Sequence, residues 1–325
     1  MKYTTSFLLA TVCLLGATNA YAQTPRINFT APMVYPEGVA YNDKTNTFFV
    51  SSVKTAAIGT VDPGGKYSVF FEDNALKSSY GMKIDPKKDR LWVCTSDGNY
   101  SKFSDPSTYK KVARLVSIDM NTKKKVDDID LAKLYPGKHF INDLTFDDKG
   151  NIYITDSYSP VICKVDAKGS ASVFTESELF KGEDVGLNGI VYNPKGFLLV
   201  ANDREGALYK VDINNPKAVS KVKIKNLFPG MDGLLWDAQG NLVIIQNKGV
   251  DKTYQLSSKD NWVSADILAS TLTTDRFQYP TTGVLQSGKI YVLNAKLNEI
   301  TDSTRAPSKE FSLQQVQFKP VLNKD

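Results

Sequence analysis

Glu37-Gly38-Val39-Ala40-Tyr41-Asn42 is the first copy of a pattern that recurs along this chain. Each copy has a polar residue, then usually a glycine and an alternating apolar stretch, and most copies end on an Asp or Asn that is typical of a turn. The other copies are Tyr80–Asp85, Asn142–Asp147, Asn188–Asn193, Asp232–Asp237 and the more degenerate Thr282–Ser287. Their first residues lie between 43 and 62 residues apart, which indicates a repeat architecture.

Each copy is followed by a turn and by further β-rich runs. The second runs are Thr47–Val50, Leu91–Val93, Ile152–Ile154, Phe197–Val200, Leu242–Ile245 and Ile290–Val292. Third runs such as Leu115–Asp119 and outer runs such as Ser68–Phe70 bring several copies to about four strands. Short strands joined by turns at this period predict an all-β fold, a six-bladed β-propeller with blades of about four antiparallel strands, rather than a sandwich.

The two ends of the repeat region predict how the ring closes. Ile27–Thr30 and Phe311–Phe318 are both strand-like, and we expect them to build the last blade together, with the N-terminal segment as its outer strand. This gives one domain over residues 24–320. Residues 97–111 are polar without apolar periodicity and predict an extended loop over one face, while Asp130–Tyr135 is the one stretch with a hint of helix.

Residues 1–22 have the features of an export signal. Lys2 gives a basic start, Phe7–Gly16 is apolar and uncharged, and Ala20-Tyr21-Ala22 fits a small-residue cleavage site. The apolar run is too short to span a bilayer, so no membrane anchor is expected after cleavage. We therefore expect an exported protein, periplasmic or secreted, and a monomer.

Charge and cysteine content exclude other classes of function. The net charge of +5 is mild and its lysines are scattered, so no basic stripe predicts nucleic-acid binding. Cys94 and Cys163 lie in apolar runs typical of buried cysteines, although export would permit a disulfide. With one histidine and no CxxC motif, a zinc site of thiolates or imidazoles is not expected.

The first residues of the six copies predict a metal site. The innermost strands of a propeller run in the same direction around its channel, so these residues should meet at one mouth of the channel. The ring is Glu37, Tyr80, Asn142, Asn188, Asp232 and Thr282. Its two carboxylates and two amides are oxygen ligands that suit one divalent cation, calcium first and magnesium or another divalent as alternatives.

The following strand of each blade returns to the same mouth and predicts a second ring. Its members are Ser52, Thr95, Asp156, Asn202, Gln246 and Asn294. Asp156 and Asn202 are the members that we expect to support the metal ligands or contact a substrate, together with Tyr80 and Thr282. Polar residues are common at strand ends, so an ordinary structural role is the alternative.

Four of these motifs give the chain a family resemblance. Glu37-Gly38, Asn142-Asp143, Asn188-Gly189 and Asp232-Gly233 resemble the regucalcin/gluconolactonase family, and more distantly the drug-responsive lactonases and the paraoxonases. The resemblance implies a metal-dependent hydrolase of a lactone or small ester. It implies Glu37, Asn142, Asn188 and Asp232 as ligands, with Asp232 also as general base or as the group that orients the attacking water.

Two alternatives stay open at the level of sequence. His139, three residues before Asn142, is a second catalytic candidate because paraoxonase-like enzymes use an imidazole near the metal, or it is a structural residue. The chain itself could be a non-enzymatic binding propeller that a metal stabilises, since Tyr80 and Thr282 occupy the ring and the Arg and Glu that hold sugar hydroxyls in sugar lactonases have no evident match.

Overall fold

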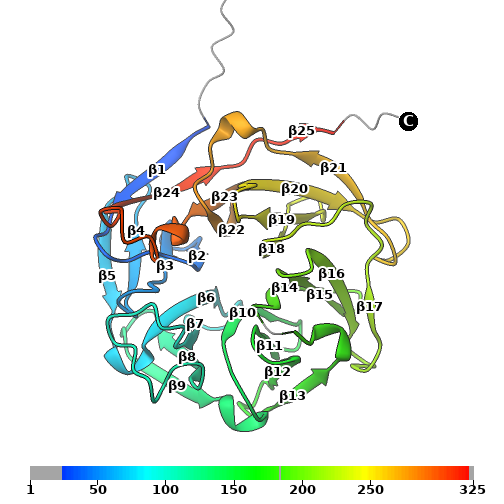
Figure 1. The fold of residues 1–325 in the computed structure, drawn as a ribbon, viewed down its shortest axis with the longest axis horizontal. Helices are drawn as coiled ribbons and strands as arrows, with labels where there is room; N and C mark the ends of the chain where they lie inside the picture. The colour runs from blue at the N-terminus through cyan, green and yellow to red at the C-terminus, as the bar shows by residue number, and fades with distance from the viewer. Residues whose placement is uncertain (1–23, 183, 322–325) are drawn as a thin grey trace, which may run out of the picture.

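The computed structural model describes residues 24–182 and 184–321, and six antiparallel sheets surround a common centre in it (Figure 1). We call the sheets blades one to six in chain order. The signal segment predicted over residues 1–22 lies outside the described residues. Among the described residues, no helix is long and apolar enough to cross a membrane.

Each blade has its first strand innermost. Blade one contains β2 (Val39–Asn42), β3 (Thr47–Val50), β4 (Ile58–Val61) and β5 (Tyr67–Phe71). Blade two contains β6 (Ser78–Ile84), β7 (Arg90–Ser96), β8 (Ala113–Asp119) and β9 (Lys125–Asp130). Blade three contains β10 (Ile141–Phe146), β11 (Ile152–Asp156), β12 (Val161–Val165) and β13 (Ala171–Glu176). The six-bladed propeller predicted from the repeats is confirmed.

The remaining blades continue this order. Blade four contains β14 (Leu187–Asn193), β15 (Phe197–Asn202), β16 (Ala207–Asp212) and β17 (Val219–Lys221). Blade five contains β18 (Met231–Trp236), β19 (Leu242–Gln246), β20 (Lys252–Ser257), β21 (Asp266–Ser270) and the short β25 (Lys319–Pro320). Blade six contains, from the innermost strand outward, β22 (Pro280–Gln286), β23 (Lys289–Asn294), β24 (Glu310–Gln315) and β1 (Arg26–Thr30).

Helical structure among the described residues is confined to 3-10 turns of three residues. They are η1 (Asn74–Leu76), η2 (Ala132–Leu134), η3 (Glu178–Phe180), η4 (Thr273–Asp275) and η5 (Leu297–Glu299). The hint of helix over Asp130–Tyr135 therefore corresponds to η2, a single tight turn at the rim of blade two.

The ring closes as the sequence predicts. β1 is the outer strand of blade six and pairs antiparallel with β24 from Arg26 opposite Gln314 to Thr30 opposite Glu310. Phe29 is 2% exposed and its ring lies 6.0 Å from the ring of Phe311. Strand pairing and an apolar contact thus join the two ends of the chain and complete blade six.

Five of the six innermost strands carry glycine just after the ring residue, and at four of these positions the next blade comes very close. A Cβ on Gly38 would lie 2.1 Å from the carbonyl oxygen of Tyr80, and one on Gly189 would lie 2.3 Å from that of Asp232. Gly81 and Gly233 face the next blade in the same way. Side chains at these positions would hold the blades apart.

Gly189→Ala should therefore destabilise the whole propeller. The added methyl group would meet the Asp232 backbone, and we expect a loss of roughly 1–3 kcal/mol in the free energy of unfolding. Chemical denaturation measures it. Gly64→Ala is the control because the nearest atom to its Cβ is a side-chain oxygen of Asp62 at 3.2 Å. Equal stabilities of the two variants would contradict the packing argument.

Candidate functional site at the mouth of the channel

The ring residues sit on β-bulges. In blades two to six the pairing of the innermost strand shifts around the ring residue, for example between Ile141 and Leu144 and between Met231 and Leu234. A bulge inserts an extra residue and turns a side chain out of the regular alternation. A backbone N–H group released in this way can find a hydroxyl partner: that of Asp143 donates to Thr155 Oγ1 at 3.2 Å. In blade one, whose pairing has no such shift, the N–H groups of Glu37 and Gly38 donate to Ser51 Oγ at 3.1 and 2.7 Å.

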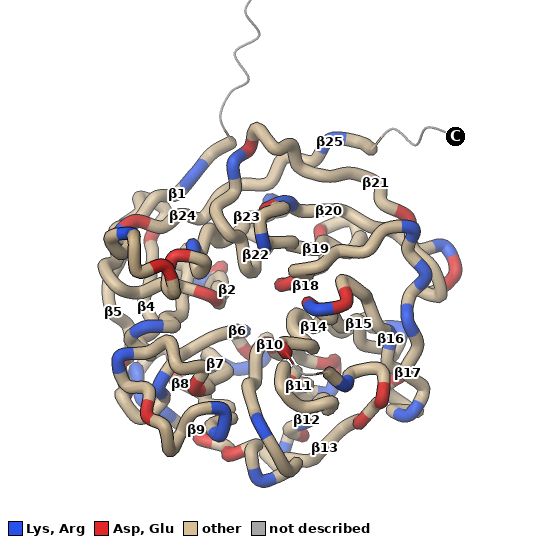
Figure 2. The backbone as a smooth tube through the Cα atoms, viewed as in Figure 1, with Lys and Arg blue, Asp and Glu red and all other residues tan. Residues whose placement is uncertain are grey.

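The four predicted ligands are buried at one end of the channel. Glu37, Asn142, Asn188 and Asp232 are each 5–6% exposed. Among the described residues, neither Glu37 Oε2 nor the carbonyl oxygen of the Asn142 side chain has a hydrogen-bond partner. Figure 2 shows acidic positions beside β2, β10 and β18 at the centre of the ring. Two buried carboxylates, one with an orphaned oxygen, beside an orphaned amide oxygen are what an oxygen-ligated cation site needs.

The two carboxylates of the ring lie close enough to repel each other. Burial, and then repulsion from Asp143, raise the pKa of Glu37 to about 8 against the attraction of Lys83. Burial, and then repulsion from Glu37, raise the pKa of Asp232 well above its usual range. Burial and repulsion thus favour the protonated, neutral form of both side chains. A bound cation would instead favour the ionised form and lower both pKa values.

Asp232 and Asn188 are held by residues that the sequence did not indicate. Asn247 Nδ2 donates to Asp232 Oδ2 at 2.6 Å. The side chain of Asn188 lies beside Asp203, whose carboxylate pairs with Lys248. Asn247 directly follows Gln246 and Asp203 directly follows Asn202, and both Gln246 and Asn202 belong to the predicted second ring. The sequence therefore predicted polar residues at these two strand ends, but one position too early.

The other predicted residues lie around this centre with different partners. Tyr80 is buried and packs against Phe140, with tilted rings whose centroids are 4.5 Å apart, and its hydroxyl has no partner among the described residues. Thr282 is buried beside Gly233. Asn202 accepts a hydrogen bond from the Glu205 N–H at 3.0 Å and so shapes the turn after β15.

His139 lies in a buried pair with Asp156, whose Oδ2 is 2.7 Å from His139 Nδ1. Burial lowers the pKa of the imidazole, but the hydrogen bond and charge of Asp156 outweigh it and the pKa is raised. A backbone hydrogen bond with Tyr135 also engages the ring, and the His139 N–H donates to the Lys110 carbonyl. These contacts fix the segment before β10, and they do not join His139 to the four ring residues.

The loop over residues 97–111 borders the mouth. Asp97 accepts hydrogen bonds from Ser104 Oγ at 2.7 Å and Thr108 Oγ1 at 2.6 Å, which fold the loop back on itself. The Lys102 N–H donates to Lys54 O of blade one at 3.0 Å. Gly98 packs against Phe140, and Phe140 packs against Tyr80 of the ring. The predicted extended loop is therefore a compact rim segment between blades.

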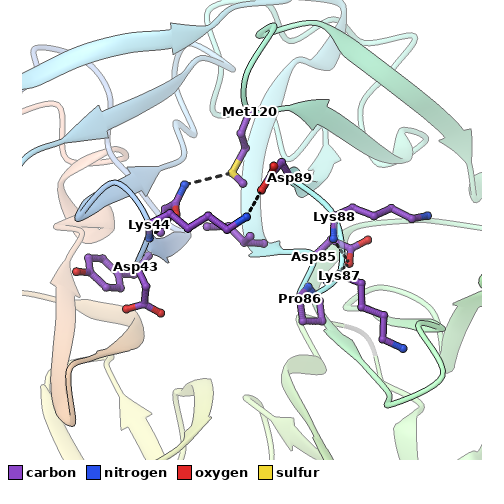
Figure 3. A pocket seen from close by; sticks show the side chains of 11 residues that line it. Asp43, Lys44, Asp85, Pro86, Lys87, Lys88, Asp89 and Met120 are labelled. Carbon is purple, nitrogen blue, oxygen red and sulfur yellow. Dashed lines mark hydrogen bonds and ion pairs between the residues drawn. The ribbon is translucent and has the colours of Figure 1, made fainter.

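Two further hollows open on the other face, where the innermost strands end. One of about 370 Å³ lies at the far end of the channel and is mostly apolar, with Phe146, Trp236 and Leu285 in its wall. The other, of about 260 Å³, lies between turns of blades one and two, where Lys44 Nζ is 2.6 Å from Asp89 Oδ1 (Figure 3). Neither contains a ring residue.

Among the described residues, no group of three or more His, Cys, Asp or Glu side chains is arranged to hold a metal. The ring has only two carboxylates, Glu37 and Asp232. A cation bound there would also need the amide oxygens of Asn142 and Asn188 as ligands. Cys94 and Cys163 are buried free thiols.

The comparisons with known proteins place the fold among six-bladed propellers. Neither a family model nor a curated protein matches the sequence. The solved structure of Mala s 1, the major allergen of Malassezia sympodialis, is 18% identical, with 90% of this chain and 96% of that one covered and a TM-score of 0.71. A protein described as a candidate gluconolactonase is 16% identical over 92% of this chain and 96% of its own, with a TM-score of 0.60.

A third similar structure is virginiamycin B lyase from Staphylococcus aureus, 12% identical over 91% of this chain and all of its own, with a TM-score of 0.58. The chain therefore has the architecture of gluconolactonase-like propellers, as the motifs predicted. At these identities the likeness concerns the fold, and the chemistry must be argued from the site.

The raised pKa of Glu37 predicts how stability depends on pH without metal. Because the folded pKa of about 8 lies above the ordinary 4.5, this group favours folding below pH 4.5, and that contribution is lost as the pH rises through 8. At about 1.4 kcal/mol per pKa unit, the loss should reach on the order of 5 kcal/mol. In the presence of a chelator, the melting temperature should fall more steeply with rising pH for the wild type than for Glu37→Gln, between pH 5 and about 8.5. Parallel curves would contradict the assignment.

Proposed function

We propose that this protein is a divalent-metal-dependent hydrolase of a lactone or small ester, with the metal at the mouth of the channel. The observation that carries the proposal is the pair of buried carboxylates, Glu37 and Asp232, beside the orphaned amide oxygen of Asn142. Burying two like charges without a counterion is unfavourable, and one divalent cation would neutralise both.

The donor set fits a hard cation. Glu37 and Asp232 would supply carboxylate oxygens, and Asn142 and Asn188 would supply amide oxygens. Oxygen ligands without thiolate or imidazole favour calcium, with magnesium or another divalent cation as the alternatives. The similarity in fold to a candidate gluconolactonase supports a lactone as the substrate class.

The chemistry divides between the cation and the residues of the chain. A divalent cation bound here would polarise an ester carbonyl and lower the pKa of water. Asn247 fixes one oxygen of Asp232 through the 2.6 Å hydrogen bond, and we assign the Asp232 carboxylate to accept the proton of the attacking water. The neighbouring Asp203–Lys248 pair keeps Asn188 in place.

The sequence supports a proposal for where the protein works and in which oligomeric state. We propose that the chain is exported to the periplasm or beyond after loss of residues 1–22, and that it works as a monomer on a small molecule. No nucleic acid or membrane partner is part of the proposal.

Asp232→Asn tests the proposal directly. It removes the proposed base and one ligand charge, so we expect at least a roughly hundredfold loss of lactone hydrolysis and a clear loss of bound metal. Metal analysis and a panel of lactones and esters, with and without chelator, measure the two effects. Asp43→Asn is the control because Asp43 is exposed in a turn of the opposite face (Figure 3).

Hydrolysis unchanged by Asp232→Asn would refute the assigned mechanism. Metal-dependent thermal stabilisation of the wild type, without hydrolysis of any member of the panel, would instead favour a binding propeller that the metal stabilises.

A further inference from the structure

A lysine lies on an innermost strand just inside the ring. The third residues after the ring residues are Ala40, Lys83, Thr145, Val191, Leu235 and Leu285. Lys83 is the charged member of this set. Its side chain is 26% exposed and its Nζ lies 3.7 Å from Asp143 Oδ1 in the neighbouring blade.

Asp143 is itself a departure from the repeat, because all five other copies have glycine at this position. Its Oδ1 accepts a hydrogen bond from the Leu144 N–H at 2.8 Å and faces Gly81, whose absent Cβ would lie 2.7 Å from it. The side chain is 7% exposed, and Oδ2 has no hydrogen-bond partner within the described residues. Asp143 thus adds a third buried carboxylate near Glu37 and Asp232.

The charges of the channel can then be counted. Lys248 pairs with Asp203, so that pair is neutral. With a cation bound and both ring acids ionised, Glu37, Asp143 and Asp232 would bring three negative charges and Lys83 one positive charge, which leaves two negative charges for the cation. The stem of Lys83 lines the apolar hollow at the far end of the channel, while its ammonium group reaches Asp143. A long side chain can place its apolar stem and its charge in different surroundings in this way.

We propose that Lys83 is a built-in cation of the channel, which neutralises Asp143 and leaves the ring with the charge for one divalent cation. The inference rests on the proposed metal site and goes beyond it, because it assigns Lys83 and Asp143 a role in setting metal affinity. Asp143 is not a ligand in this proposal.

Three variants test the charge count. Lys83→Met should bind calcium roughly tenfold more tightly than the wild type, because an unpaired carboxylate is left near the ring. Asp143→Asn should bind calcium roughly tenfold more weakly, because the lysine charge is left unpaired. The double variant restores the net charge and should return to within roughly threefold of the wild-type affinity. Isothermal titration calorimetry with calcium chloride measures all three.

A second readout and a matched control separate charge from packing. In chelator, Lys83→Met should melt below the wild type, and calcium should raise its Tm by more than it raises that of the wild type. Lys87→Met is the control, since Lys87 is exposed on the opposite face (Figure 3) and its ammonium group binds only the Asp148 carbonyl among the described residues. Its calcium affinity should match that of the wild type.

The outcomes distinguish this inference from the proposed function. The predicted order of affinities without hydrolysis of any lactone would support the role of Lys83 and refute the hydrolase. A folded Lys83→Met variant that binds calcium no more tightly than the wild type, or a double variant without recovery, would overturn the role of Lys83. If Lys83→Met does not fold, Asp143→Asn decides alone, and unchanged affinity overturns the inference. Absence of calcium binding in every variant overturns both proposals.

Discussion

The close approach of the innermost strands is the constraint on which the rest of this molecule depends. Six first strands must surround one axis, and at Gly38 and Gly189 the next blade comes within 2.3 Å of where a Cβ would be. That spacing leaves no room for a side chain between blades, so each ring residue directs its side chain elsewhere, toward the channel. The same constraint that packs the propeller therefore gathers its polar groups at one mouth.

The bulges convert this packing into a site. A regular strand would point successive residues to opposite faces, and the ring residue with its glycine would continue that alternation. The extra residue in blades two to six breaks the alternation where the ring residue sits. A hydroxyl group such as Thr155 Oγ1 satisfies the displaced backbone N–H of Asp143, so the bulge does not leave that N–H unpaired.

Electrostatics then separates two buried polar centres that look alike in the sequence. The His139–Asp156 pair is internally balanced, with its ring nitrogen and carboxylate in a 2.7 Å contact. Glu37 and Asp232 repel each other and have orphaned neighbours. A balanced pair stabilises a fold, whereas an unbalanced group of charges is suited to bind something of the opposite charge.

The sequence by itself determined the blade number, the order of strands within a blade, the closing role of the N-terminal strand and the six ring positions, because all of these follow from a repeated pattern and its period. Only the tertiary structure decided that Asn247 rather than Gln246 holds Asp232, that Asn188 lies beside Asp203, and that Lys83 reaches Asp143 in the next blade. The physical reason is that a bulge shifts the register by one residue without a signal in composition. Contacts between blades, moreover, join residues whose separation along the chain carries no periodicity.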